Sequence, residues 1–320
     1  MNRIIMMDTL RFLLRSQLKR SQIVHRISGF TLIELLIAMV LAVLVITPLL
    51  GFMVNIMSTD RQEQAKVNSE QEIQTALDYI TRDMQQSVYI YGSTAVENIK
   101  TSLPPASTTQ VPVLVFWKRN LLNKAVDNNQ NDTFVYSLVA YYLIQDTSSN
   151  SSIWSNAARI ARWEIKDGVL KPNNTSTSPT CPADYVTNFC PSTGLGKLIS
   201  NPSISVLDNL KNWKSLGVAN TDVPVPLVDF IDQTKVTDGA PAATCPPNYA
   251  KLPSSSVDTL QMSGFYACVD EPNTTAQIYL RGNALMRLQN TSDQKYSTNK
   301  SNYFPSANAR MQGRGYLFTK

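Results

Sequence analysis

The chain has 320 residues, enough for one sizeable domain with an appendage or for two small domains, and its formal net charge is +5. This charge does not predict nucleic-acid binding, because residues 1–29 already carry a net charge of +5 and the rest of the chain sums to zero. The single histidine, His25, lies in the same segment, which excludes Ser-His-Asp, Cys-His and histidine-ligated metal sites from the rest of the chain.

Residues 1–29 form a basic arm in front of a long apolar segment. Asp8 is its one acidic residue, and its basic residues are Arg3, Arg11, Arg15, Lys19, Arg20 and Arg26. Basic residues that precede an apolar segment stay on the cytoplasmic side of a membrane. The arm therefore predicts the topology of the chain rather than a ligand.

The apolar segment is long enough to cross a membrane. From Leu35 to Thr59 there are 25 residues without a charge, and a bilayer core needs about 20 apolar residues in a helix. The segment is too long for an ordinary signal-peptide core, and no A-x-A-like cleavage site follows it. The simplest interpretation is a single-pass signal anchor in contact with membrane lipid.

One acidic residue, Glu34, stands at the start of this segment. A simple anchor has no use for a carboxylate there, and an unpaired charge in lipid costs about 2.5–3.5 kcal/mol on insertion scales. The nearest candidate cation would be a free α-amino group a few residues upstream. Such a group exists only if the chain is cut just before Phe30.

The stretch SGFTLIELLIAMVLAVLVI, residues 28–46, resembles the class III signal of type IV prepilins and pseudopilins. The resemblance implies that a prepilin peptidase cuts between Gly29 and Phe30 and that Phe30 becomes N-methylated. Glu34 is then the fifth residue of the mature protein and is expected to pair with the Phe30 amine of a neighbouring subunit during assembly. The resemblance also implies other pilins or pseudopilins and an inner-membrane assembly platform as partners, with the leader in the cytoplasm and the head in the periplasm or in a surface filament.

Pro48 and Gly51 lie inside the apolar segment. Proline removes a backbone hydrogen bond and kinks a helix, and glycine loosens it. In a lone anchor the pair would be a tolerated defect. In pilin-like filaments this zone is often bent or unwound, so we expect a kink here.

A stem helix is predicted to continue beyond the membrane. Apolar residues recur in steps of three and four, which makes one helix face, at Ile73, Leu77, Ile80, Met84 and Val88. The pattern predicts one helix over residues 30–91, ending at Gly92, with a length of about 90 Å. The apolar face is expected to pack on a head rather than to form a coiled-coil seam. The expected division is a leader at 1–29, a transmembrane and stem helix at 30–91 and a globular head at 92–320.

The head is predicted to be mainly antiparallel sheet. Strand-like stretches occupy residues 113–119, 133–144, 158–171, 265–270 and 276–288, and Lys166-Asp167-Gly168 resembles a hairpin turn. The loops between them are rich in Ser, Asn, Thr and Pro. A long helix followed by such strands gives an α+β fold, which is also the fold that the pilin resemblance implies.

The four cysteines all lie in the C-terminal half of the chain. An even number downstream of an export-type segment indicates disulfides formed in an oxidising compartment. Local pairs, Cys181–Cys190 and Cys245–Cys268, are favoured, and the two other pairings stay open. A zinc site is disfavoured because no C-x₂-C spacing is present.

Two C-terminal stretches, IYLRGNALMRL and YFPSANARMQGRGYLF, are similar to minor pseudopilins of cyanobacterial hormogonium polysaccharide secretion, and the stem is similar to minor components of the PilW and J types. This resemblance implies a filament that exports polysaccharide and supports gliding. Type II secretion, a pilus-borne adhesin or carbohydrate-binding tip, and a conventional anchored periplasmic protein remain alternatives.

No other pattern predicts a catalytic site, a metal or a cofactor. The run DNNQND at 127–132 has calcium-loop oxygens at Asp127, Asn129 and Asn131, but Asp132 stands where a calcium loop needs Gly and Leu138 where it needs Glu, so a hairpin loop is favoured. Aromatic residues at strand spacing could line a sugar-binding face but are favoured as core: Trp117, Tyr136, Tyr141, Tyr142, Trp154, Trp163 and Tyr279.

Overall fold

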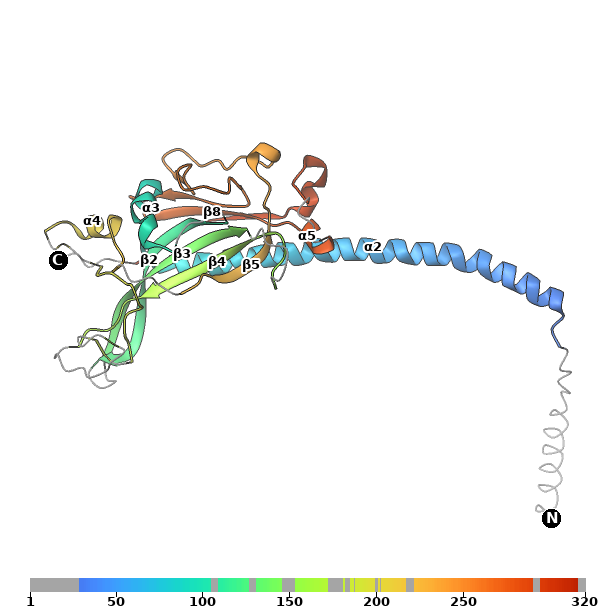
Figure 1. The fold of residues 1–320 in the computed structure, drawn as a ribbon, viewed down its shortest axis with the longest axis horizontal. Helices are drawn as coiled ribbons and strands as arrows, with labels where there is room; N and C mark the ends of the chain where they lie inside the picture. Colours follow the sequence, from blue (N-terminus) through green and yellow to red (C-terminus); the bar gives the residue numbers. More distant parts are fainter. Residues whose placement is uncertain are drawn as a thin grey trace, which may run out of the picture. The chain divides into compact units, whose positions relative to one another are not determined.

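The computed structural model describes residues 29–104, 109–126, 131–145, 153–171, 181, 185–186, 188–198, 201, 203–216, 222–289 and 294–315. It confirms the α+β fold: one long N-terminal helix is followed by two antiparallel sheets (Figure 1). The chain divides into two units, Met1–Thr59 and Asp60–Lys320, and helix α2 contributes to both.

Helix α2 spans Leu32–Gln85, a length of 54 residues. The predicted end at Tyr91 is therefore wrong, because Ser87–Ile90 forms strand β1 instead. All four residues of β1 are buried. A short run that is buried on both sides suits a strand between two layers, whereas a helix would expose one side of it.

The first sheet has the order β1-β2-β3-β4-β5 and is antiparallel throughout. Strands β2 (Gln110–Val126) and β3 (Asn131–Gln145) form a long hairpin that contains the predicted strands 113–119 and 133–144. Strand β4 (Ala158–Lys166) pairs with β3 on one side and with β5 (Val225–Ile231) on the other. Strand β4 ends at Lys166, and the predicted hairpin at 166–168 does not form. Instead Ser192 donates its N–H to Lys166 O at 2.8 Å, and Val169 donates its N–H to Phe189 O at 2.9 Å.

The second sheet has the order β6-β7-β8-β9, formed by Ala250–Leu252, Phe265–Asp270, Thr275–Arg281 and Ser306–Gln312. The predicted strand 265–270 is confirmed. The predicted strand 276–288 is right only to Arg281, since Leu285–Leu288 forms the short helix α5. Asn283 Oδ1 accepts hydrogen bonds from the N–H groups of Leu285 and Met286, which favours a helical turn over a continued strand.

The short helices lie in the connections of the head. They are α3 (Ser93–Ile99), α4 (Val206–Lys211) and the 3₁₀ turns η1 (Lys100–Ser102), η2 (Val236–Asp238) and η3 (Thr298–Tyr303).

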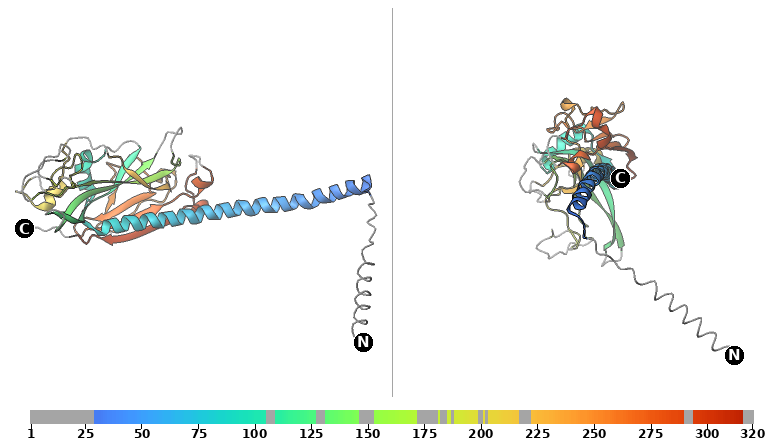
Figure 2. Two further views of the ribbon diagram at one scale, coloured as in Figure 1. Left: turned by 90° about the horizontal axis from the view of Figure 1, so that it is seen from below. Right: turned by 90° about the vertical axis from the view of Figure 1, so that its right-hand side faces the viewer.

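The last turns of α2 run alongside the strands and contribute one face to the core (Figures 1 and 2). Ile73, Leu77, Ile80 and Met84 are buried, as the periodicity predicts. Gly282, just after β8, approaches this helix so closely that a Cβ there would lie 2.7 Å from Ser69 Oγ. The glycine therefore sets how near the second sheet can come to α2.

The structure contains both of the favoured disulfides, Cys181–Cys190 and Cys245–Cys268. Cys268 lies in β7 of the second sheet and is fully buried, and the 23-residue separation of its pair spans the connection that carries β6. The bonds close loops in the unfolded chain and so stabilise a head with long connections.

Candidate functional site

The start of α2 is built by the sequence Thr31-Leu-Ile-Glu34. Thr31 precedes the first helical residue, and its Oγ1 accepts a hydrogen bond from the Glu34 N–H at 3.3 Å. This is the threonine half of a capping box, in which Ser or Thr at the N-cap is followed three residues later by Glu or Gln. Glu34 thus occupies the first turn, where a carboxylate also interacts favourably with the positive end of the helix dipole.

Phe30 and Glu34 are both exposed at this end of the helix, with 78% of the Phe30 surface accessible. No described residue forms an ion pair with the Glu34 carboxylate. Gly29 lies at the first described position, immediately before Phe30. The sequence-predicted cleavage, methylation and assembly residues are therefore consecutive or one turn apart, and a group from outside the described chain can reach them.

The next turns of α2 expose apolar side chains on every side. Every residue from Leu32 to Asp60 is exposed, including Leu36 at 55% and Phe52 at 65%. Among the described residues, α2 is the one helix long and apolar enough to cross a membrane. A helix that is apolar all round needs lipid or other helices around it. Its uncharged interval of 25 residues spans about 37 Å, enough for a hydrocarbon core of about 30 Å.

Helix α2 continues without interruption through Pro48 and Gly51. Proline leaves the Leu44 carbonyl without its usual i+4 donor, and Thr47 Oγ1 hydrogen-bonds the neighbouring Val43 carbonyl at 2.7 Å. A Cβ on Gly51 would meet nothing within 4 Å, so nothing described within the chain requires a glycine there. The expected local unwinding is not observed, and the kink stays a prediction.

Where α2 enters the head, the C-terminal segments hold it through polar contacts. Tyr303, at the end of η3, donates its hydroxyl to Gln62 Oε1 at 2.9 Å, and Lys66 Nζ lies 4.6 Å from the centre of the Tyr303 ring. Arg287 of α5 forms an ion pair with Glu72. These contacts fix the turns of the helix that follow the apolar segment.

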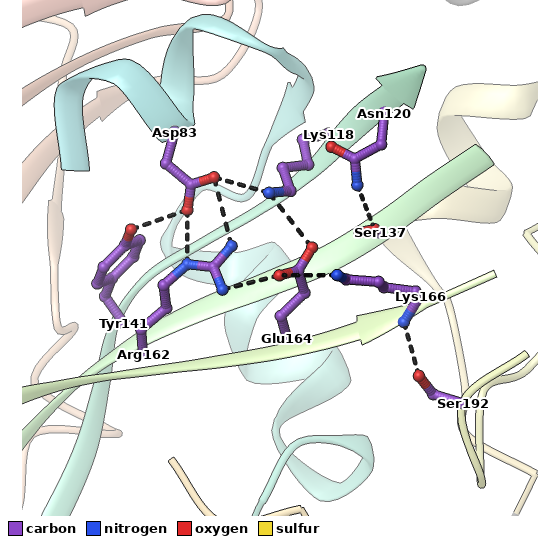
Figure 3. A network of polar contacts seen from close by, with 9 residues as sticks. All are labelled: Asp83, Lys118, Asn120, Ser137, Tyr141, Arg162, Glu164, Lys166 and Ser192. Carbon is purple, nitrogen blue, oxygen red and sulfur yellow. Dashed lines mark hydrogen bonds and ion pairs between the residues drawn. The ribbon is translucent and has the colours of Figure 1, made fainter. Parts of the chain in front are cut away.

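The last turns of α2 are tied to the first sheet by a network of four charged residues and a tyrosine (Figure 3). The Asp83 carboxylate lies 2.8 Å from both Lys118 Nζ on β2 and Arg162 Nε on β4. Glu164 on β4 lies 2.8 Å from Arg162 Nη1 and 3.2 Å from Lys118 Nζ. Tyr141 on β3 donates its hydroxyl to Asp83 Oδ2 at 2.8 Å. Two acids and two bases thus neutralise one another, and the exposed Lys166 Nζ lies 3.9 Å from Glu164 as well.

The network keeps both acids ionised although little solvent reaches them. Burial alone would raise the pKa of the Asp83 carboxyl, but the hydrogen bond from Arg162 and the charge of Lys118 outweigh it and hold the pKa below its ordinary value. Burial likewise opposes ionisation of Glu164, and the hydrogen bond and charge of Arg162 lower its pKa. Burial raises the pKa of Tyr141, so its hydroxyl stays a donor. Mutually neutralised groups of this kind position a helix and are not arranged for proton transfer.

Sequence reasoning missed this network. Asp83 adjoins Met84 at the edge of the buried stripe of α2. Arg162 and Glu164 alternate with the buried Trp163 along β4. The periodicity of the sequence therefore places each of these three charged residues on one face of its element. That signal says which face each residue occupies but not which distant strand supplies its partner.

Most of the aromatic residues belong to the core, as favoured. Trp117, Tyr141, Tyr142 and Trp163 are at most 2% exposed. The others are Trp154, which is 41% exposed, and Tyr136 and Tyr279, which are half-buried.

The calcium interpretation finds no support in the described residues. Asp127 and Asn129 lie outside them, and Asp132 accepts a hydrogen bond from the Lys124 N–H at 2.7 Å. Within the described part of the chain, no three His, Cys, Asp or Glu residues are grouped so as to hold a metal ion.

Residues 24–50 match the family model for the prokaryotic N-terminal methylation motif. This match supports a type IV pilin-like protein, because the motif includes the class III signal, and it implies processing by a prepilin peptidase and assembly with other pilins. Proteins with the motif are structural subunits rather than enzymes. No curated protein and no solved structure matches the chain. The motif and the apolar helix together indicate a single-pass membrane-anchored protein.

Proposed function

We propose that this protein is a non-enzymatic minor subunit of a type IV pilus-like or secretion filament. The observation that carries the proposal is the methylation motif at residues 24–50, which leads directly into a helix with apolar side chains on every side and one acid in its first turn. In this proposal the leader of residues 1–29 is removed after Gly29, and the new N-terminus at Phe30 is methylated. The rest of α2 is the stem, and the first strand of the head is β1 at Ser87–Ile90.

The proposed role of Glu34 follows from the cost of its charge. In the membrane an unpaired carboxylate is either expensive or protonated. When subunits stack, the Phe30 amine of one subunit would reach Glu34 of its neighbour, and methylation would keep the amine positively charged. Such a pair adds little net stability, but a mismatched register leaves a charge uncompensated at a high cost. The pair would therefore select one axial position for each subunit.

Two observations support a head outside the cytoplasm. The disulfides Cys181–Cys190 and Cys245–Cys268 need an oxidising compartment, and the basic arm favours a cytoplasmic leader. We therefore propose an inner-membrane protein with a periplasmic head that an assembly platform builds into a filament.

We further propose that the filament serves polysaccharide secretion and gliding motility. The support is the resemblance carried by residues 278–288 and 303–318. Residues of these two stretches, Arg287 and Tyr303, are among those that contact α2 where it enters the head. A head of more than 220 residues also suits a subunit used sparingly, since a major pilin must pack many times along a filament.

Mass spectrometry of the protein from its native membrane tests the processing step. We expect an N-terminal peptide that begins with N-methyl-Phe30. Recovery of the intact leader in cells with an active prepilin peptidase would contradict the filament role and leave an anchored domain. A deletion strain scored separately for surface polysaccharide and for pili then tests which machine the subunit serves.

A further inference from the structure

The second sheet carries an aromatic row on the face that is turned away from the core. Along β7, Phe265, Ala267 and Val269 belong to the core, and Tyr266 lies between the first two. Side chains alternate across a strand, so Tyr266 occupies the opposite face. The register pairs Tyr266 with Tyr279 on β8 and Tyr279 with Asn308 on β9. The three side chains therefore lie side by side across three strands.

The two tyrosine rings stack on each other, so the pair offers its outer ring faces and its edges to a ligand. Their ring centroids are 4.5 Å apart, and the ring planes differ by only 6°. Tyr296 and Phe304, which contact each other edge to face at 5.2 Å, line the same pocket. Together with Ser263, Ser306 and Asn308 they line a pocket of about 340 Å³, within the size range of small-ligand sites.

The pocket is neutral. Arg281 is the one charged residue among those that line it, and its Nε lies 2.7 Å from Asp232 Oδ2. Arg281 also donates to Ser263 Oγ at 2.8 Å, so its charge is already paired and held within the protein. An anionic or cationic ligand would find no opposite charge here, which favours an uncharged ligand.

We propose that this pocket, the tyrosine pocket, binds a neutral carbohydrate. One face of a sugar ring presents C–H groups, which pack on aromatic rings, and the ring edge presents hydroxyls. The exposed Asn308 amide offers donors and an acceptor, and the hydroxyls of Ser301 and Ser306 offer both at the rim of the pocket. Sugar hydroxyls would satisfy these groups when the ligand displaces water from the pocket.

A proline-rich peptide is the other ligand that aromatic grooves recognise. Proline rings would pack on the tyrosines equally well, and the peptide carbonyls can accept hydrogen bonds, but proline has no N–H to donate to the Asn308 carbonyl oxygen and the serine hydroxyls. Groups that lose water without gaining a partner cost binding free energy. The polar rim therefore favours a sugar over a peptide.

This inference extends the proposed role in polysaccharide export by naming a glycan contact. It depends on the second sheet and not on cleavage or filament assembly. Binding can therefore be tested on unassembled protein, and its failure would leave the filament proposal untouched.

The test uses the full chain in a zwitterionic detergent without a sugar headgroup, and saturation-transfer NMR with neutral gluco-, galacto-, manno- and xylo-oligosaccharides as probes. We expect at least one probe to bind, Tyr279→Ala to weaken it about tenfold or more, and Tyr279→Phe to retain most of it. Phe134→Ala, an exposed aromatic on the first sheet, is the matched control and should bind like the wild type. Thermal unfolding of each variant checks its fold, and Asn308→Ala, an exposed position, replaces Tyr279→Ala if that variant unfolds.

The proposal is overturned if no probe binds at millimolar concentration. It is also overturned if binding survives unchanged in folded Tyr279→Ala and Asn308→Ala variants. Binding of a polyproline peptide at the tyrosine pocket, with no sugar competing for it, would replace the carbohydrate by a peptide ligand.

Discussion

Asp83 on α2 and Arg162 on β4 are joined by two contacts, from Arg162 Nε to Asp83 Oδ2 at 2.8 Å and from Nη2 to Oδ1 at 3.3 Å. The two residues are 79 positions apart in the chain. A guanidinium fork of this kind fixes direction as well as distance. It therefore sets how the last turns of the stem lie on the central strands of the head.

Loss of the Asp83 carboxylate is expected to destabilise the head strongly. Asp83→Ala leaves Lys118 and Arg162 with one acid between them, and breaking a buried ion pair costs about 3–5 kcal/mol. The expected fall in Tm is of order 10 °C for a domain of this size. Tryptophan fluorescence is a suitable readout, because all four tryptophans lie in the head.

Asp78→Ala is the matched control for Asp83→Ala. Asp78 lies on the exposed face of the same helix, and an exposed surface substitution changes stability by roughly 0.5 kcal/mol or less. Equal effects of the two substitutions would mean that the network does not hold the helix.

The same network makes the stability of the head depend on pH. The pKa values of Asp83 and Glu164 are both lower in the folded protein than their ordinary values, so the unfolded chain binds protons first as the pH falls. The stabilisation is therefore fully present above about pH 5 and is lost as the pH falls through the folded pKa values. Urea unfolding between pH 7 and pH 3 should show this loss. Asp83→Asn should be less stable at pH 7 and should lose less stability on acidification, and parallel curves for the two proteins would contradict the assignment.

Glu34→Ala is expected to separate membrane insertion from assembly. Removal of the charge makes the helix easier to insert, so the variant should reach the membrane at the wild-type level. Its incorporation into sheared filaments should fall by about tenfold or more, since a loss of 1.4 kcal/mol already changes an equilibrium tenfold. Glu63→Ala, which removes an exposed acid beyond the apolar segment, is the control. Incorporation of Glu34→Ala at the control level would refute the proposed register role.

The two disulfides should contribute unequally. By loop-closure entropy, the Cys245–Cys268 bond with its separation of 23 residues is worth about 3.5 kcal/mol, and the Cys181–Cys190 bond with its separation of 9 about 2.7 kcal/mol. Cys268 is also fully buried, whereas Cys190 is half-buried. We therefore expect the double variant Cys245→Ser/Cys268→Ser to have a lower urea midpoint than Cys181→Ser/Cys190→Ser. A lower urea midpoint for Cys181→Ser/Cys190→Ser would instead mean that the loop between Cys245 and Cys268 is already ordered in the unfolded chain.

Gly282→Ala should disturb the contact between the second sheet and α2. The new Cβ would lie 2.7 Å from Ser69 Oγ and 3.0 Å from Ile73 Cγ1, and such overpacking costs about 1–3 kcal/mol. Ser69→Ala removes the nearer of these atoms. The double variant Gly282→Ala/Ser69→Ala should therefore lose less free energy of unfolding than the sum of the losses in the two single variants. If the two losses simply add, the residues are not in contact.

The periodic elements were predictable because their signals are local. The stripe of Ile73, Leu77 and Ile80 fixed the buried face of α2, and the β2–β3 and β7 strands lie where alternation and β-branched residues favour them. The helix was predicted from residue 30 and begins at Leu32, where the local signal is Thr31, whose hydroxyl accepts from the Glu34 N–H. Each of these features depends only on residues that are close together in the sequence.

Other features were decided by partners far along the chain. Ser87–Ile90 became a strand because β2 offers it a pairing edge. The turn signal at Lys166-Asp167-Gly168 failed because Lys166 and Val169 form backbone hydrogen bonds with Ser192 and Phe189 instead. The tyrosine pocket needs the register of three strands, and the network around Asp83 needs β2, β3 and β4 in order.

The sequence by itself determined the membrane segment, the motif around Gly29 and Phe30, the acid at Glu34 and the α+β class. Composition and periodicity carry the membrane segment and the α+β class, because the free energy of burial depends on which residues share a face, whereas the motif around Gly29 and Phe30 is carried by its match to the methylation motif. Only the tertiary structure decided where α2 ends, what neutralises Asp83 and which aromatic residues remain on an outer face. Those outcomes depend on the register and order of strands, which are set by contacts between residues tens of positions apart.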